Sequence, residues 1–352
     1  MNLKPSETIF RFLFSSPAHF AGECEGEDFW LTPAFPSFDR RGRELLAIGA
    51  GPFRRSHFCF SVEVPKRDKS AMTYPMYEWV GEEMSALLGA FYGKLILNLG
   101  HVQAGRFVTV PSMPERRFHR YDKPPFNDRP RCPNGVEPNL AEAAPLIAKY
   151  VKVAATDDQL PLLVRSADFY RLALETYDER PEVAFAMLIS TLEVLTGLRG
   201  YTEEELYDEQ LLADLRLIET SCADGLQIAR RLRGRLYQVK RKVAALARDL
   251  VPDTFFEQRE TKLPWGFIQD RAELVERIRA AYDIRSRLLH TGNRSGLWYI
   301  EYDHQGEERG AGEPVLEDKE LVKLLGRSVN LVGLERITST VLRAMIVQWL
   351  TR

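Results

Sequence analysis

The chain has few cysteines and no long apolar run. Its four cysteines are far apart, which excludes a disulfide framework and a paired zinc knuckle and fits a reducing cytoplasm; they are Cys24, Cys59, Cys132 and Cys222. No apolar stretch of about 18 residues is free of charge, and the first 20 residues lack a signal-peptide pattern. We therefore expect a cytoplasmic protein that is neither secreted nor membrane-spanning.

Net charge is also nearly absent. The 352 residues include 48 Lys and Arg against 50 Asp and Glu, a formal charge of -2. This balance gives no whole-chain argument for a nucleic-acid or membrane partner, so any such argument must come from how the charges are distributed. Apolar residues make up 45% of the chain, which excludes a disordered protein, and the length allows two domains with separate cores.

Motifs for common cofactors are missing as well. The sequence contains no Walker loop, dinucleotide fingerprint, nucleophile elbow or zinc-protease motif. Five of the six histidines are scattered without metal-ligand spacing; they are His19, His57, His101, His119 and His304. We expect neither a metal nor a cofactor.

Proline is scarce after residue 145. Fifteen of the 20 prolines precede residue 146, and proline interrupts helices and sheet ladders. A long helical bundle is therefore excluded from the first part of the chain and permitted in the second. Residues 111–138 hold seven prolines with five arginines between them, and this segment is expected to be an extended connector or a surface loop.

Residues 1–145 are predicted to form a mixed α+β domain. Apolar side chains recur every three or four positions in residues 77–92, which predicts a helix. Runs rich in aromatic and β-branched residues predict strands at residues 9–14, 29–32, 45–48, 58–64, 95–99 and 107–110.

Residues 150–352 are predicted to form an all-helical bundle, because the apolar period is 3.6 almost throughout. Residues 296–302 alternate like a strand and are followed by three glycines, so a hairpin-like insertion is expected at 296–312. The helices are predicted at residues 157–177, 181–195, 202–222, 226–250, 270–290 and 317–349.

Charge in the second domain is segregated. Residues 201–224 have eight acidic side chains and one basic, and residues 225–248 have eight basic side chains and no acidic one. One interpretation is a solvated surface that pairs with its acidic neighbour. The other is a phosphate-binding ridge whose RNA-binding residues are Arg230, Arg231, Arg235, Lys240, Arg241 and Lys242.

The segment 281–292, AYDIRSRLLHTG, contains the most informative polar residues. Ser286 and His290 are four residues apart and share a helix face, whereas Arg285 and His290 are five apart and about 140° around the axis. Arg285 and His290 would meet only if the helix unwinds near its end, or if a second subunit supplies one of them.

Structural interpretations of these residues are also open. An arginine and a histidine near a helix C-terminus stabilise the negative end of the helix dipole. Arg287 follows Asp283 by four residues, a spacing that favours an ion pair within the helix.

The pattern Tyr282-x-x-Arg285-Ser286-x-x-x-His290-x-Gly292, preceded by the amphipathic helix 184–197 with its Leu192-Glu193-Val194-Leu195 segment, resembles the HEPN superfamily. It is most similar to the Apea-like branch. Arg285 and His290 match the arginine–histidine motif of the superfamily, with Ser286 in its usual polar position. The resemblance covers residues 155–350. Thr291 departs from the pattern because it separates the histidine from the glycine.

The resemblance implies metal-independent cleavage of RNA at the interface of a homodimer. The RNA 2′-hydroxyl is an internal nucleophile, so the enzyme has to move protons and stabilise the transition-state charge. His290 would move protons, with the acid role favoured near a helix C-terminus, and Arg285 would bind the phosphoryl oxygens. Ser286 would orient the histidine or donate to phosphate. Glu193 would pair with Arg285 or remain on the helix surface, and the other supporting residues would be Tyr282 and Arg287.

The products would carry a 2′,3′-cyclic phosphate and a 5′-hydroxyl. The resemblance further implies a prokaryotic antiviral-defence ribonuclease of the abortive-infection or toxin type, acting on RNA such as tRNA. A phage-derived molecule or an antitoxin would regulate it, and residues 1–145 would act as a sensor or select the substrate. The alternative is a non-catalytic HEPN module that binds nucleic acid or protein.

Overall fold

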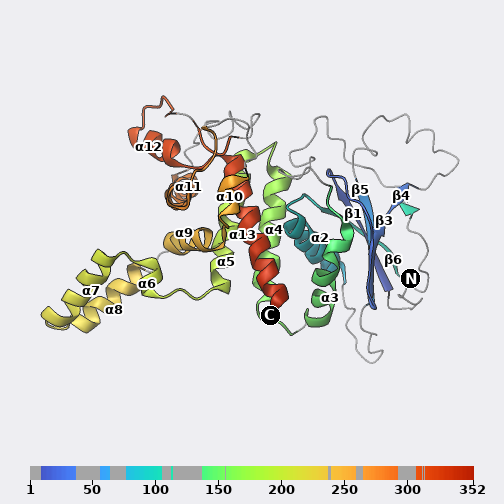
Figure 1. Cartoon of the computed structure of the whole chain (residues 1–352), viewed down its shortest axis with the longest axis horizontal. Helices are drawn as coiled ribbons and strands as arrows, with labels where there is room; N and C mark the ends of the chain where they lie inside the picture. The colour runs from blue at the N-terminus through green and yellow to red at the C-terminus, as the bar shows by residue number, and fades with distance from the viewer. Residues whose placement is uncertain are drawn as a thin grey trace. The chain divides into compact units, whose positions relative to one another are not determined.

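The chain forms an α+β first part followed by a helical second part, which confirms the predicted fold class (Figure 1). Two compact units are present, residues 1–180 with 346–352 and residues 181–345, and each is described by itself. The residues that the computed structural model describes are 9–36, 56–63, 77–104, 112–113, 137–154, 156–236, 239–258, 265–291, 307–310, 312 and 314–352.

The first unit contains a five-stranded antiparallel sheet. The strand order is β2-β3-β5-β1-β6, and the pairing of β1 with β6 is interrupted by two register shifts. Four of the predicted strands are confirmed. The strands of the sheet are β1 (Ile9–Ser16), β2 (Cys24–Glu25), β3 (Phe29–Pro33), β5 (Ser56–Glu63) and β6 (Leu97–Ala104).

A second, parallel pair joins β4 (Phe35–Pro36) to β7 (Ser112–Met113). The predicted strands at residues 45–48 and 107–110 lie outside the described residues, as does most of the proline-rich segment.

One face of the sheet packs against α2 (Glu78–Tyr92), which confirms the helix predicted there (Figure 1). This face is aromatic, with the buried rings of Phe12 and Phe60 stacked at a centroid distance of 6.4 Å. Gly81 allows the close approach of the helix, because a Cβ at that position would lie only 2.5 Å from Phe12 Cδ1. The sequence therefore needs glycine here for contact rather than for a turn.

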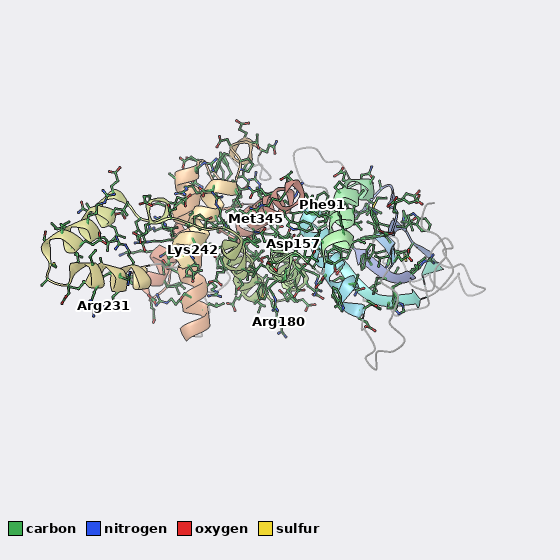
Figure 2. All side chains as sticks on the ribbon, turned by 90° about the horizontal axis from the view of Figure 1, so that it is seen from below. Phe91, Asp157, Arg180, Arg231, Lys242 and Met345 are labelled. Atoms are coloured by element: carbon green, nitrogen blue, oxygen red, sulfur yellow. The ribbon has the colours of Figure 1, made fainter. Side chains whose placement is uncertain are left out.

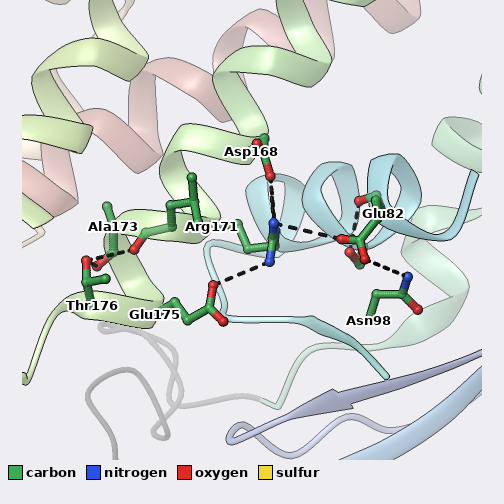
Figure 3. Close-up of polar contacts among 9 residues, drawn as sticks. Glu82, Asn98, Asp168, Arg171, Ala173, Glu175 and Thr176 are labelled. Carbon is green, nitrogen blue, oxygen red and sulfur yellow. Dashed lines mark hydrogen bonds and ion pairs between the residues drawn. The ribbon is translucent and has the colours of Figure 1, made fainter. Parts of the chain in front are cut away.

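Charged side chains join α2 to α4 (Leu160–Thr176) (Figure 3). The Arg171 guanidinium on α4 lies 2.8 Å from Asp168, 3.4 Å from Glu175 and 3.8 Å from Glu82 of α2. Glu82 also accepts a hydrogen bond of 3.1 Å from Asn98 Nδ2 on β6. This cluster ties two helices to the edge strand of the sheet.

A helix that the sequence did not predict, α3 (Ala144–Val153), runs across the expected division between the domains. Pro145 stands in its first turn, a position that proline tolerates. Tyr150 on α3 donates a hydrogen bond of 2.5 Å to Glu83 on α2. The compact units divide at Pro181, and a boundary between independently folding domains at residues 145–150 stays a prediction.

The second unit is helical over its described residues. The predicted helices at 181–195 and 270–290 are present with nearly the same limits. The helices are α5 (Pro181–Leu195), α6 (Glu203–Leu206), α7 (Glu209–Ser221), α8 (Gly225–Leu236), α9 (Val239–Leu250), α10 (Thr254–Glu257), α11 (Arg271–Thr291), α12 (Lys319–Arg327) and α13 (Leu331–Thr351), the last of which ends in the first unit.

Three helices predicted as continuous are divided in the structure. The 202–222 helix is interrupted where Asp208 caps α7 and its side chain accepts a hydrogen bond from the backbone of Leu211. The 226–250 helix forms α8 and α9, and the 317–349 helix forms α12 and α13. Between the last two, the Ser328 carbonyl accepts a hydrogen bond from Arg277, so a tertiary contact replaces the helical one.

A buried ion pair holds residues 307–310. These residues belong to the expected hairpin-like insertion, and they are most of the part of it that the structure describes. Glu308 is fully buried and pairs with Arg336 of α13, and its other carboxylate oxygen accepts a 3.0 Å hydrogen bond from the Ile268 backbone. The Arg336 guanidinium lies 3.8 Å from the ring centroid of Phe255. The rest of residues 296–312, except Gly312, lies outside the described residues.

Residues 181–198, mainly α5, are long and apolar enough to cross a membrane by length and composition, in a search of the described residues. Half of this segment is buried within the structure, as in the core helix of a globular protein, which meets the same criterion.

Candidate functional site

A polar cluster lies where α5 contacts α11, and it contains the arginine of the motif. Arg285 Nη2 on α11 donates to Glu193 Oε2 at 2.8 Å and to Ser190 Oγ at 3.4 Å. Ser190 and Glu193 are three residues apart on α5, so both face the same neighbour. The side chains of Arg285 and Glu193 are each 19% exposed, so water screens this ion pair only in part.

Tyr282 belongs to the same cluster. It precedes Arg285 by three residues, and its hydroxyl lies near the Glu193 carboxylate. Burial first, and then the negative charge of Glu193, raise the pKa of Tyr282, so it remains a hydrogen-bond donor. Glu193 therefore accepts a hydrogen bond from Arg285 of the neighbouring helix, which is the pairing considered for it, and Tyr282 lies beside this pair.

The Arg285 guanidinium retains donor capacity. Its Nε is buried and has no hydrogen-bond partner within the described part of the chain. An arginine has five N–H donors in a planar fork, and a carboxylate that holds one edge leaves others for a second anion.

The α11 helix continues through the whole motif, to Thr291. His290 therefore lies in the last turn of the helix, as predicted, and unwinding before His290, one of the two ways in which it could meet Arg285, is not observed. On a continuous helix Arg285 and His290 point about 140° apart, whereas Ser286, which is half-buried, shares the face of His290. The His290 side chain itself lies outside the described residues. Within one chain, the helix does not bring Arg285 and His290 to one face.

Arg287 does not form the expected ion pair with Asp283. Its Nη2 instead pairs with Asp318, whose carboxylate also caps α12 by accepting from the Leu321 backbone. Asp283 pairs with Lys240 of α9 at 2.5 Å. Both partners come from neighbouring helices, so interhelical packing overrides the intrahelical spacing.

The basic segment is divided between two helices, with Arg231 on α8 and Lys242 on α9 (Figure 2). Arg230 and Arg231 are exposed, and Lys242 is half-buried. Lys240 is paired with Asp283, and the Arg241 guanidinium lies 5.1 Å from the Tyr207 ring centroid. The side chain of Arg235 lies outside the described residues.

Within the described part of the chain, the expected pairing of basic and acidic segments is seen at Arg233. Arg233 of α8 pairs with Glu203 at 2.7 Å and with Glu219 of α7, and the hydrogen bonds that it donates to these carboxylates raise its pKa. Arg230 and Arg231 are therefore the exposed cations that a phosphate ridge on α8 would use.

Among the described residues no group of three His, Cys, Asp or Glu side chains is placed to hold a metal ion. Cys24 and Cys59 are buried, and burial raises the pKa of Cys24 to about 12 and that of Cys59 to about 11. These two thiols are therefore poor nucleophiles.

Ser190 was not among the predicted site residues. Its spacing would have indicated it, since Ser190 precedes Glu193 by three residues and therefore lies on the same face of that helix. Comparisons with protein-family models, with curated proteins and with solved structures find no match for this chain. The HEPN resemblance therefore depends on the motif residues alone.

Proposed function

We propose that this protein is a metal-independent endoribonuclease of the HEPN type, of the Apea-like branch, which cleaves RNA through attack by its own 2′-hydroxyl. The observation that carries the proposal is the state of Arg285. Glu193 and Ser190 hold its Nη2, while 19% of its side chain stays exposed. A fixed arginine that is still partly accessible suits phosphoryl oxygens.

The active site would be shared by two copies of the chain. Because Arg285 and His290 point about 140° apart on a continuous helix, Arg285 of one copy would act with His290 of the other. Arg285 would stabilise the charge on the phosphorane oxygens. As the 2′-oxygen bonds to phosphorus and releases its proton to solvent, His290 would protonate the departing 5′-oxygen and the P–O5′ bond would break. This step leaves a 2′,3′-cyclic phosphate and a 5′-hydroxyl.

Glu193 would orient Arg285 rather than contact RNA. A carboxylate at 2.8 Å orients the guanidinium, and the Tyr282 hydroxyl lies near the same carboxylate. The same contacts favour a second candidate, a non-catalytic HEPN module, since an interhelical ion pair between α5 and α11 also serves structure alone. The experiment below distinguishes a catalytic ribonuclease from a non-catalytic module.

The test is RNA cleavage in EDTA by the wild type and by three single variants. His290→Ala and Arg285→Ala are expected to abolish cleavage. Arg279→Ala is the matched control, because Arg279 is an exposed arginine on the same helix. The expected fragments end in a 2′,3′-cyclic phosphate. Cleavage that survives either motif substitution, or no cleavage by the wild type together with RNA binding, contradicts the enzyme, and the second result supports the module.

The proposed biological role is cytoplasmic defence against phage, with a phage-derived molecule or an antitoxin as regulator. Strong expression in bacteria should then slow growth, and His290→Ala should relieve the effect. Equal growth of cells that express the two proteins at the same level contradicts a toxin-like role.

A further inference from the structure

The hairpin of α7 and α8 has an incomplete core. The two helices pack mainly on each other and lie side by side, joined by the three residues 222–224 (Figure 1). Gly225 is required at this tight turn, because a Cβ there would lie 2.2 Å from the Ile218 carbonyl oxygen. A connection this short makes the helices antiparallel. Leu215 and Ala229, which point at each other's helix, are buried.

Five further apolar residues of the hairpin are half-buried. One of them, Leu212, lies about 60° from Leu215 on the side opposite to the other four. At about 100° per residue, two of the other four lie 40–60° to one side of Leu215, and the remaining two lie 60–100° to the same side of Ala229. In an antiparallel pair these two sides form one face. The apolar face of the hairpin consists of Leu211, Ile218, Ile228 and Leu232.

The other face of the hairpin is more polar, although it includes Leu212 and the exposed Leu226, and an ion pair lies on it. Glu219 and Arg233 lie about 40° to the other side of Leu215 and Ala229, and they form an ion pair across that face. Helix geometry places both residues on the same face, and the observed ion pair between Glu219 and Arg233 agrees with that placement.

The two edges of the apolar face differ in charge. α7 has three acidic side chains against one arginine, whereas α8 has four arginines and no acidic residue. Asp214 on the α7 edge and Arg231 on the α8 edge are both exposed. With a rise of 1.5 Å per residue, Asp214 and Arg231 lie at about the same height along the hairpin.

We propose that the apolar face of the hairpin binds the same face of a second copy of this chain. A two-fold axis parallel to the helices would place α7 of each copy over α8 of the other. The four residues of the apolar face of each copy then form the centre of a four-helix bundle. Asp214 of each copy faces Arg231 of the other at the edge. The alternative two-fold axis, across the helices, would stack acidic α7 on acidic α7 and basic α8 on basic α8.

The first test measures self-association of the full chain by analytical ultracentrifugation over a range of concentrations. Ile228→Glu is expected to weaken the dimer about 100-fold, since the substitution occurs twice and each copy loses about tenfold. Leu226→Glu is the matched control, because Leu226 is 71% exposed on the polar side of the same helix. It should leave the dimer unchanged, and circular dichroism should show that both variants keep their helix content.

Charge reversal provides a test that does not disturb the apolar core. Asp214→Arg and Arg231→Asp should each weaken the dimer about tenfold, and combining them should restore it. A monomeric wild type overturns the proposal and leaves the apolar face to a different protein. A dimer that Ile228→Glu and both charge reversals leave intact also overturns it, and assigns the dimer to another surface. The readout is mass, so the result is independent of whether the protein cleaves RNA.

Discussion

The buried pair of Glu308 and Arg336 gives the sharpest stability prediction. Arg336→Ala leaves the Glu308 carboxylate fully buried with a backbone hydrogen bond from Ile268 but without its counter-charge. It also removes a 2.7 Å hydrogen bond from Arg336 to the Phe255 carbonyl and the contact of the guanidinium with the Phe255 ring. Removal of one partner from a buried ion pair costs about 3–5 kcal/mol, so we expect a loss of this size.

The matched control is an exposed ion pair. Lys323 and Glu320 lie 3.6 Å apart, with side chains 66% and 77% exposed, and a pair of this kind contributes about 0.5 kcal/mol or less. Urea denaturation followed by circular dichroism should therefore shift strongly for Arg336→Ala and hardly for Lys323→Ala. The double substitution Glu308→Leu with Arg336→Met should lose less than Arg336→Ala, because no buried charge remains. Equal midpoints for Arg336→Ala and Lys323→Ala would refute this reasoning.

Three further predictions concern the first unit and the α8 surface. Gly81→Ala should destabilise by about 1–3 kcal/mol in thermal unfolding, because its Cβ would overlap Phe12; an unchanged midpoint contradicts the close contact. Burial raises the pKa of Glu83 above its usual 4.5, so in the folded state its protonated form is favoured and stability falls as pH rises through the raised pKa. The stability of Glu83→Gln should therefore match that of the wild type below about pH 4.5 and exceed it near neutral pH. Urea midpoints of the two proteins that differ equally at both pH values contradict this direction of the pH dependence. Arg230→Glu should weaken RNA binding and reduce its salt dependence by about one phosphate contact in fluorescence anisotropy, and identical salt slopes would exclude a phosphate ridge at this residue.

Much of the fold could be predicted because local periodicity decides it. The α2, α5 and α11 helices follow apolar spacing closely, and four sheet strands coincide with aromatic and β-branched runs. The divided helices could not be predicted from spacing, because the break between α12 and α13 depends on contacts of residues 328–330 with Arg277 and Glu308. The α3 helix was not predicted, although Pro145 stands in its first turn, where proline is tolerated.

The candidate site was predictable in part. The Glu193–Arg285 pair follows from two motifs about 90 residues apart that face each other across α5 and α11. The partners of Arg287 and Asp283 were wrong because sequence spacing reports only neighbours on the same helix, and here Asp318 and Lys240 of other helices are bound instead. The segregated charge left a solvated surface and a phosphate-binding ridge open on one predicted helix, residues 226–250, whereas the segment forms two helices with different contacts.

The central claim is a ribonuclease site that two copies share, and mixed dimers test it most directly. Arg285→Ala and His290→Ala chains with different affinity tags would be co-expressed, and dimers that contain one of each purified through both tags. If Arg285 of one copy acts with His290 of the other, one of the two sites is intact, and the mixed dimer should cleave RNA at about half the wild-type rate. A mixed dimer as inactive as its two parents, beside an active wild type, would contradict the shared site.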